Sequence, residues 1–313
     1  MTAWLATALA SVLLALATFP QLQARWTPLA LAASFSPYAL GVWALAVLLL
    51  ALGGRESARW LAVAPAVGLL VHALTLTAYL PHPASTDPGT LSVATVNLRF
   101  GEADLSRATD TPLFSAQVLV LTEVTTANLT VIDSPGWQRR FPYRVGKVGR
   151  SNAGDPHGTL ILSVYPLTEL GEARGSRFLN VAARARTPRG DLVVVGAHPQ
   201  NPMGGAAGWV FDGGALTTLV ERERGATPVV VAGDLNAINE HLTVRELVAR
   251  GLSDAAVQAG AGWRPTWPAG RWYPPLIPID HVLVSDGLTA TAVDTVEIPG
   301  TDHLGLVAEL NRG

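Results

Sequence analysis

The hydrophobic pattern divides the chain at about residue 90. Before that point lie three apolar segments, Ala3–Phe19, Ser36–Leu52 and Trp60–Leu80, none of which contains Asp, Glu, Lys or Arg. The third has the ~20 residues that a helix needs to cross a bilayer, and the other two are at the short end of that range. We therefore predict a transmembrane region with three helices over residues 1–80. A cleaved signal peptide is the alternative for the first segment, but no Lys or Arg precedes it.

After residue 90 the pattern changes to short apolar runs separated by turns. Runs such as VLVL, VVVG and VVVA do not alternate with polar residues, so both faces of these strands are expected to be buried. We predict an α/β domain of two packed β-sheets flanked by helices over residues 91–313, joined to the membrane region by a Pro-rich linker, residues 81–90. The expected strands are Leu91–Leu98, Gln117–Val124, Thr159–Tyr165, Phe178–Arg186, Asp191–His198, Pro228–Asp234, Asp280–Ser285 and Leu304–Leu310, and the expected helices are Gly214–Glu223 and Thr243–Arg250.

Polar side chains recur where these strands begin or end. Asp234 and Asn236 are two residues apart after one strand, so their side chains point to the same side. Asp302 and His303 precede the last strand and add a carboxylate and a group that titrates near neutral pH. A carboxylate at the end of a buried strand needs a hydrogen-bond partner, a counter-charge or a metal. Each residue alone could be a turn former, but their number predicts a catalytic cluster. Its other members are Asn97, Glu123, His198 and Asp280.

This set, in this order, resembles the endonuclease/exonuclease/phosphatase superfamily, which comprises metal-dependent phosphoesterases with a deoxyribonuclease-I-like fold. The G-D-L-N motif at 233–236 and the strand HGTLILSVYPL at 157–167 add to the resemblance. The resemblance implies Mg²⁺ or Mn²⁺ as cofactor, because carboxylate and amide oxygens suit hard cations. The implied metal ligands are Asn97, Glu123 and Asp302.

The same resemblance implies a role for each catalytic residue. Asp234 would orient or deprotonate the attacking water, and Asn236 would hydrogen-bond the phosphate. Asp280 would hold His303 so that its imidazolium stabilises the phosphoryl oxygens. His198 would be a second phosphate contact or the acid that protonates the leaving group. The identity of the base and the number of metals stay open at this point.

More narrowly, three apolar segments ahead of such a domain resemble VanJ-type teicoplanin-resistance membrane proteins. The local matches are HPQNP at 198–202, GWRPTWP at 262–268 and IPGTDHLGL at 298–306. This resemblance implies a multi-pass protein of the cytoplasmic (inner) membrane with an extracytoplasmic catalytic domain. It also implies a role in glycopeptide resistance and a lipid-linked phosphate or pyrophosphate as substrate, with undecaprenyl pyrophosphate as the lipid it points to.

The distribution of charge predicts the orientation of the membrane region. Arg55 and Arg59 lie in the second loop and Arg25 in the first, so the positive-inside rule places the second loop in the cytoplasm and the domain outside. The linker reaches at most ~30 Å. The domain is therefore expected to work close to the lipid membrane.

Two sets of residues outside the cluster are candidate substrate contacts. Trp209 and Trp267 lie in apolar loops near the cluster, and such aromatics suit a membrane interface, although packing over the end of the sandwich is an equal alternative. Arg144 and Lys147 belong to a basic run that could grip a pyrophosphate or be part of a solvated loop.

The leading functional hypothesis is thus a membrane-anchored phosphoesterase. A nuclease or phospholipid phosphodiesterase of the same fold is one alternative, and an inactive membrane sensor is another. Residues 91–313 hold 19 Lys and Arg against 22 Asp and Glu, whereas a nuclease needs a basic groove, so no nucleic acid is expected as partner. The chain has no Cys, which excludes disulfides and thiolate metal sites. No protein partner is predicted.

Overall fold

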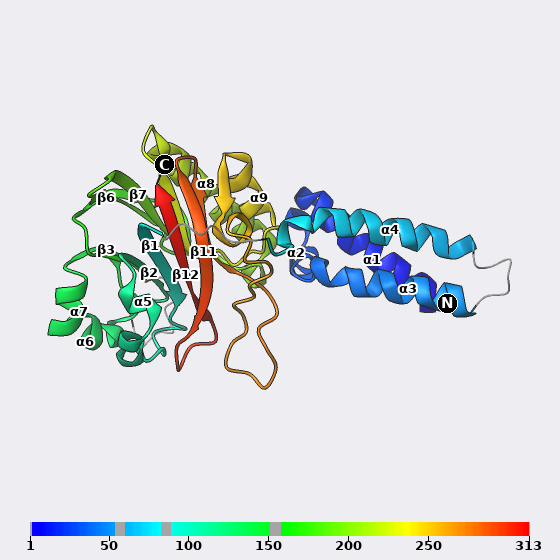
Figure 1. Cartoon of the computed structure of the whole chain (residues 1–313), viewed down its shortest axis with the longest axis horizontal. Coiled ribbons are helices and arrows are strands. Elements are labelled where there is room, and N and C mark those ends of the chain that lie inside the picture. Colours follow the sequence, from blue (N-terminus) through cyan, green and yellow to red (C-terminus); the bar gives the residue numbers. More distant parts are fainter. Residues whose placement is uncertain (1, 54–59, 83–88, 151–157, 313) are drawn as a thin grey trace.

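The computed structural model describes residues 2–53, 60–82, 89–150 and 158–312. Within them the chain forms a β-sandwich and a bundle of apolar helices that extends from one end of it (Figure 1). The charge-based orientation depends on Arg55 and Arg59, which lie outside the described residues, as do linker residues 83–88 and His157.

Each sheet of the sandwich has six strands, in the orders β11-β12-β1-β2-β4-β3 and β5-β6-β7-β8-β10-β9. Two neighbouring pairs, β1–β2 and β7–β8, are parallel, and the other pairs are antiparallel. The strands are β1 (Leu91–Asn97), β2 (Val118–Thr122), β3 (Tyr143–Lys147), β4 (Thr159–Ser163), β5 (Leu167–Glu172), β6 (Val181–Thr187), β7 (Gly190–Ala197), β8 (Val229–Asp234), β9 (Leu252–Asp254), β10 (Asp280–Ser285), β11 (Leu288–Glu297) and β12 (Leu304–Arg312).

The central strands are buried on both faces. Val93 and Val120 of one sheet belong to the same core cluster as Val194 and Val230 of the other, between the sheets. Separate apolar clusters cover the outer faces, formed with short helices on the first sheet and two longer helices on the second. This arrangement explains the non-alternating runs and confirms the predicted sandwich. The helices are α5 (Pro112–Ser115), α6 (Leu129–Ile132), α7 (Pro135–Arg140), α8 (Ala206–Arg224), α9 (Leu242–Ala249) and α10 (Ala255–Gln258).

The eight predicted strands are all present, with ends that differ from the expected ones by up to three residues. Four further strands, β3, β5, β9 and β11, were not predicted, and all four are edge strands. An edge strand is covered on fewer sides than a central one, so its sequence is more polar and its hydrophobic signal weaker. The sequence LTELGE of β5 illustrates this.

In the N-terminal unit, defined as residues 2–53 and 60–80, the three longer helices α1, α3 and α4 are apolar and pack against one another (Figure 1). Ala10, Leu13, Ala39 and Trp43 form the buried centre of this packing. The helices of the unit are α1 (Thr2–Thr18), α2 (Thr27–Ala33), α3 (Ala39–Gly53) and α4 (Val63–Thr75), with short 3₁₀ turns η1 (Pro20–Arg25), η2 (Ser36–Tyr38) and η4 (Thr77–Tyr79).

Helix length does not support three membrane spans. In the part of the chain that the structure describes, one helix, Ser36–Gly53, is long and apolar enough to cross a membrane, and by itself it is weak evidence of a span. The apolar helices Thr2–Thr18 and Trp60–Thr75 are shorter. The third predicted segment is interrupted because α4 ends at Thr75 and the chain turns through η4 before it reaches the sandwich.

Candidate active site

Strand direction brings the predicted cluster together at one edge of the sandwich. Because β1 and β2 are parallel, as are β7 and β8, the carboxyl ends of each pair lie side by side. Strands β10 and β12 run antiparallel to β8 and β1, so they begin at the same edge. The residues that follow or precede these strand ends are Asn97, Glu123, His198, Asp234, Asn236, Asp280, Asp302 and His303.

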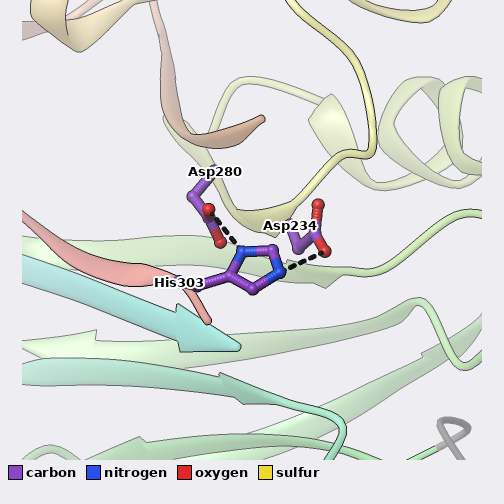
Figure 2. A group of neighbouring side chains, drawn as sticks. All are labelled: Asp234, Asp280 and His303. Carbon is purple, nitrogen blue, oxygen red and sulfur yellow. Dashed lines mark hydrogen bonds and ion pairs between the residues drawn. The ribbon is translucent and has the colours of Figure 1, made fainter. Parts of the chain in front are cut away.

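His303 lies between two carboxylates (Figure 2). Its Nδ1 atom is 2.8 Å from Oδ2 of Asp280, and its Nε2 atom is 3.9 Å from Oδ2 of Asp234. All three side chains are buried. Burial lowers the pKa of His303, but the neighbouring carboxylates of Asp280, Asp234 and Asp302 outweigh it and raise the pKa to about 10. The imidazole is therefore protonated at neutral pH.

Asp234 is held by two amide groups. The side-chain Nδ2 of Asn97 donates to its Oδ2 at 2.9 Å, and the backbone N–H of Asn236 donates to its Oδ1 at 2.8 Å. Asn236 adopts a left-handed conformation, φ 48°, which Asn tolerates better than most residues, and its Nδ2 donates to the carbonyl of Pro199. Burial raises the pKa of Asp234 despite the nearby imidazoles. The carboxylate is thus positioned as a proton acceptor.

Glu123 points to the same centre from the other sheet. It accepts a hydrogen bond from Nδ2 of Asn97 at 3.1 Å and another from the backbone N–H of Phe100 at 2.7 Å. His198 Nε2 lies 3.7 Å from Glu123 Oε1 and 3.8 Å from Asp234 Oδ2, so it bridges the carboxylates of the two sheets. Burial raises the pKa of Glu123.

Asp302 completes the acidic side of the site. Trp267 donates from Nε1 to its Oδ2 at 3.3 Å, and Arg99 Nε lies 3.9 Å from its Oδ1. The backbone carbonyl of Asp302 accepts from Ala269 N–H at 2.7 Å, which fixes the aromatic loop, residues 259–279 between α10 and β10, against the cluster. Trp267 therefore contacts one of the predicted metal ligands directly.

The donor set fits a divalent cation. Glu123 and Asp302 are partly exposed carboxylates that interact electrostatically with each other, and carboxylate oxygens are the ligands that hard divalent cations prefer. Asn97 Oδ1 accepts from Arg99 N–H at 2.8 Å, and its Nδ2 faces the carboxylates. Ligation through its oxygen would therefore require the amide to rotate by half a turn.

A second group, formed by Asp234, Asp280 and His303, also brings its oxygen and nitrogen atoms within 4.8 Å of one another. This group is a poorer metal site because the imidazole is protonated and its Nδ1 is bonded to Asp280.

Three of the four residues predicted to contact the substrate have their partners outside the catalytic cluster. Arg144 forms an ion pair with Asp133, and Lys147 forms one with Glu172. Trp209 is 0% exposed and packs edge-to-face on His241, with ring centroids 5.3 Å apart. It packs inside the protein, the alternative considered for it, and takes no part in the surface around the cluster.

Several residues that support the site were not identified from the sequence. His281 bonds Asp254 at 2.6 Å and the carbonyl of Ala237 at 2.7 Å, and the adjacent Asp280–His281 pair was the signal for it. Phe178 stacks on His198 with ring centroids 4.9 Å apart, and Asn180 Oδ1 accepts from the His198 backbone N–H. These two residues precede β6, and no sequence pattern links them to His198.

Solved structures with the same fold support this description. An endonuclease/exonuclease/phosphatase from Beutenbergia cavernae has a TM-score of 0.55 and 20% identity, covering 71% of this chain and 72% of that chain. A family protein from Leptotrichia buccalis has a TM-score of 0.54 and 13% identity, and a mannosyl-6-phosphatase from Bacteroides thetaiotaomicron has 0.50 and 17%. Each of these two covers 71% of this chain and 100% of its own. At these identities the likeness shows the fold alone.

The sequence itself was also compared with families and with individual proteins. No curated protein matches it significantly. The profile of the family described as the endonuclease/exonuclease/phosphatase family matches residues 85–303, which is more than two thirds of the chain and ends at His303 of the catalytic cluster. The chain therefore belongs to the endonuclease/exonuclease/phosphatase family.

Proposed function

We propose that this protein is a membrane-anchored, divalent-metal-dependent phosphoesterase that hydrolyses a lipid-linked phosphate or pyrophosphate. Members of the family hydrolyse phosphoesters and generally use divalent metals. The observation that carries the lipid assignment is that the catalytic edge is docked on a helical unit with apolar outward faces.

The outward faces of the N-terminal unit suit lipid better than water. Large apolar side chains on all three long helices are exposed, among them Leu9, Leu48 and Leu70. Among the described residues of the unit, Arg25 is the only Asp, Glu, Lys or Arg. An apolar surface of this kind is solvated poorly by water and well by a bilayer. Helix α1 is ~25 Å long, which is short for a membrane span but matches a thin or locally compressed bilayer.

Exposed aromatic residues mark both ends of the unit. Trp4 is near the start of α1 and Trp60 precedes α4, and these helix ends lie far from the sandwich (Figure 1). Phe19, Trp26 and Phe35 belong to the segment between α1 and α3, at the ends of these helices nearer the sandwich. Trp and other amphipathic aromatics favour the two interfaces of a membrane. The aromatic residues at the near end support the proposal that this end lies at the headgroup level, with the catalytic domain beside the phosphate groups of lipids.

In the proposed reaction, Mg²⁺ or Mn²⁺ held by Glu123 and Asp302, with Asn97 after rotation, would neutralise charge on the phosphate. Asp234 accepts the proton of the attacking water, for which a carboxylate pKa raised by burial is suited. His303, kept protonated by Asp280, donates from Nε2 to a phosphoryl oxygen. Asn236 and His198 complete the phosphate contacts. As the water oxygen bonds to phosphorus, the phosphorus–oxygen bond to the leaving group breaks, and the leaving oxygen departs with a proton taken from solvent or from His198.

The finer part of the proposal is a VanJ-like enzyme that acts outside the cytoplasmic membrane on an isoprenyl pyrophosphate such as undecaprenyl pyrophosphate. Protease added to intact spheroplasts should digest the domain beyond residue 90. Protection in intact spheroplasts, with digestion only after lysis, would place the domain in the cytoplasm and contradict this topology.

The substrate is tested with the full-length protein in mixed micelles. Phosphate release should be Mg²⁺-dependent and fastest with an isoprenyl pyrophosphate, when compared with phospholipids, soluble nucleotides and duplex DNA. The Asp234→Asn variant controls for contaminating phosphatases. Preference for DNA or soluble nucleotides over every lipid would overturn the lipid assignment and leave the phosphoesterase assignment in place.

A further inference from the structure

The catalytic edge is attached to the N-terminal unit by more than the linker. Three catalytic-edge loops meet the segment between α1 and α3. After the His198 loop, Ala206 N–H donates to Thr27 Oγ1 at 3.0 Å. In the aromatic loop before Asp280, the Leu276 carbonyl accepts from Tyr38 OH at 2.6 Å. The third contact, to the loop after Asp234, is the most extensive.

Gln23 of η1 is the centre of this third contact. Its side chain is 0% exposed. Its Nε2 donates to the carbonyls of Glu240 at 2.9 Å and Leu16 at 3.0 Å, and its Oε1 accepts from Leu242 N–H at 3.0 Å. Leu242 begins α9, and the first amides of a helix have no partner within it. Gln23 therefore joins α1 to the turn before α9 through a fully bonded, buried amide.

Two further side chains hold the same turn, residues 238–242. His241 donates from Nε2 to the Ala30 carbonyl at 3.0 Å and accepts from Ile238 N–H at Nδ1. Tyr79, at the other end of the unit's sequence, donates to the Glu240 carboxylate, with distances of 2.9 and 3.0 Å to its two oxygens. The turn is thus bonded to η1, α2 and η4.

This turn follows the catalytic residues directly. Leu235 N–H is bonded to the Ile279 carbonyl, and the Ala237 carbonyl is bonded to His281 Nε2. Asn236 lies between these two anchors, and only Ile238 and Asn239 separate Ala237 from Glu240. A shift of the turn is therefore transmitted over a few residues to Asn236 and Asp234. Catalysis is sensitive to such shifts, because a displacement of 1 Å costs about 100-fold in rate.

We propose that Gln23 is a positioning residue, and that the N-terminal unit sets the geometry of Asp234 and Asn236 in addition to anchoring the protein. This inference rests on the proposed phosphoesterase function. A simple tether would affect only the use of membrane-bound substrate. A positioning role also affects turnover of a soluble phosphoester, which needs no membrane.

The test compares Gln23→Met with Gln21→Met in the full-length protein. Methionine is similar in length to glutamine and lacks its hydrogen bonds, and Gln21 is exposed two residues earlier on η1. Hydrogen exchange is measured over residues 235–242, and kcat and KM are measured with bis(p-nitrophenyl) phosphate and with an isoprenyl pyrophosphate. Gln23→Met should speed exchange and lower kcat about 10- to 100-fold for both substrates, with KM changed by less than about threefold. Gln21→Met should match the wild type.

Other outcomes overturn the inference. Faster exchange with unchanged kcat would make Gln23 purely structural, and a loss confined to the lipid substrate would make the unit only an anchor. Unchanged exchange would show that Gln23 does not hold the turn. If Gln23→Met does not fold, Tyr79→Phe serves in its place, since it removes the hydrogen bonds of Tyr79 to Glu240. It should also speed hydrogen exchange of residues 235–242 and lower kcat for both substrates, by smaller factors. A wild-type kcat in Tyr79→Phe would contradict the inference. If the wild-type protein were inactive on all phosphoesters, the proposed function would be overturned instead. Hydrogen exchange over residues 235–242 would still show whether Gln23 holds the turn.

Discussion

Asp280 Oδ2 lies 2.8 Å from His303 Nδ1, and both side chains are buried. The bond orients the imidazole and favours its protonated form, which leaves Nε2 directed towards Asp234. The pair joins β10 of one sheet to the residue before β12 of the other. The relative position of the two sheets therefore determines where the His303 imidazole lies.

The first prediction concerns this pair. Asp280→Asn should lower kcat by about 100-fold or more, because the imidazolium loses its partner and stabilises the phosphoryl oxygens poorly. Asp286→Asn is the matched control, since Asp286 follows the opposite end of β10 and its side chain is 96% exposed. Steady-state kinetics with a soluble phosphoester measures both. Equal kcat for the two variants would remove Asp280 from the catalytic unit.

The second prediction concerns the metal. Treatment with EDTA should abolish turnover, and added Mg²⁺ or Mn²⁺ should restore it. Glu123→Gln should raise the Mg²⁺ concentration needed for half-maximal activity by about tenfold or more, because a carboxylate ligand is replaced by a neutral amide. Activity that persists in excess EDTA, in protein shown to be metal-free by elemental analysis, would contradict a metal-dependent reaction.

The third prediction concerns stability and pH. Burial lowers the pKa of His241 in the folded protein to about 4, below the ordinary value of 6.5. The unfolded chain therefore binds the proton more readily, so the contribution of His241 is fully present above pH 6.5 and is lost as pH falls towards 4. By this linkage, the contribution of His241 to the free energy of unfolding should fall by about 2 kcal/mol between about pH 8 and about pH 5, whereas His303, whose pKa is raised to about 10, contributes in the opposite direction over the same range.

Denaturation in detergent at several pH values checks this expectation. His241→Gln should be less stable than the wild type at pH 8, since its bonds to Ala30 and Ile238 are altered, and this deficit should shrink by about 2 kcal/mol between about pH 8 and about pH 5. If the difference in unfolding free energy between His241→Gln and the wild type were the same at pH 8 and pH 5, His241 would not take up a proton on unfolding.

The fourth prediction separates two tryptophans of the aromatic loop. Trp272 is 96% exposed, so Trp272→Ala should raise KM for a lipid substrate in micelles by about threefold to tenfold and leave a soluble phosphoester unaffected. Trp267 bonds Asp302, so Trp267→Phe should lower kcat for both substrates. Identical behaviour of the two variants would show that the loop does not distinguish membrane from soluble substrate.

Much of the catalytic cluster could be predicted from the sequence because its chemistry is local. The strands that precede His198 and end at Asp234 contain the continuous apolar runs LVVV and VVVA, and such runs predict strands buried on both faces. Polar residues at the ends of those runs are conspicuous for the same reason. Their types and order were enough to predict a sandwich and a metal-dependent phosphoesterase site, and the family match supports both at that level.

Edge strands and side-chain environments could not be predicted in this way. The β5 and β11 strands pair along only one edge, so their hydrophobic signal is weak. Tryptophan is a residue type that favours membrane interfaces, but Trp209 is buried against His241. Its burial depends on how α8 packs in the folded protein, which the local sequence does not show. The pair of Asp254 and His281 also forms only when β9 lies beside β10.

The amino-acid sequence by itself therefore determined the central strands, the apolar helices and the polar residues that the fold brings together at one end of the sandwich, since these follow from local hydrophobic periodicity and side-chain chemistry. Only the tertiary structure decided which residues position that chemistry. Gln23 and Glu240 are 217 residues apart and are bonded at 2.9 Å. No local pattern encodes such a contact, because its free energy depends on the packing that brings the N-terminal unit and the catalytic edge together.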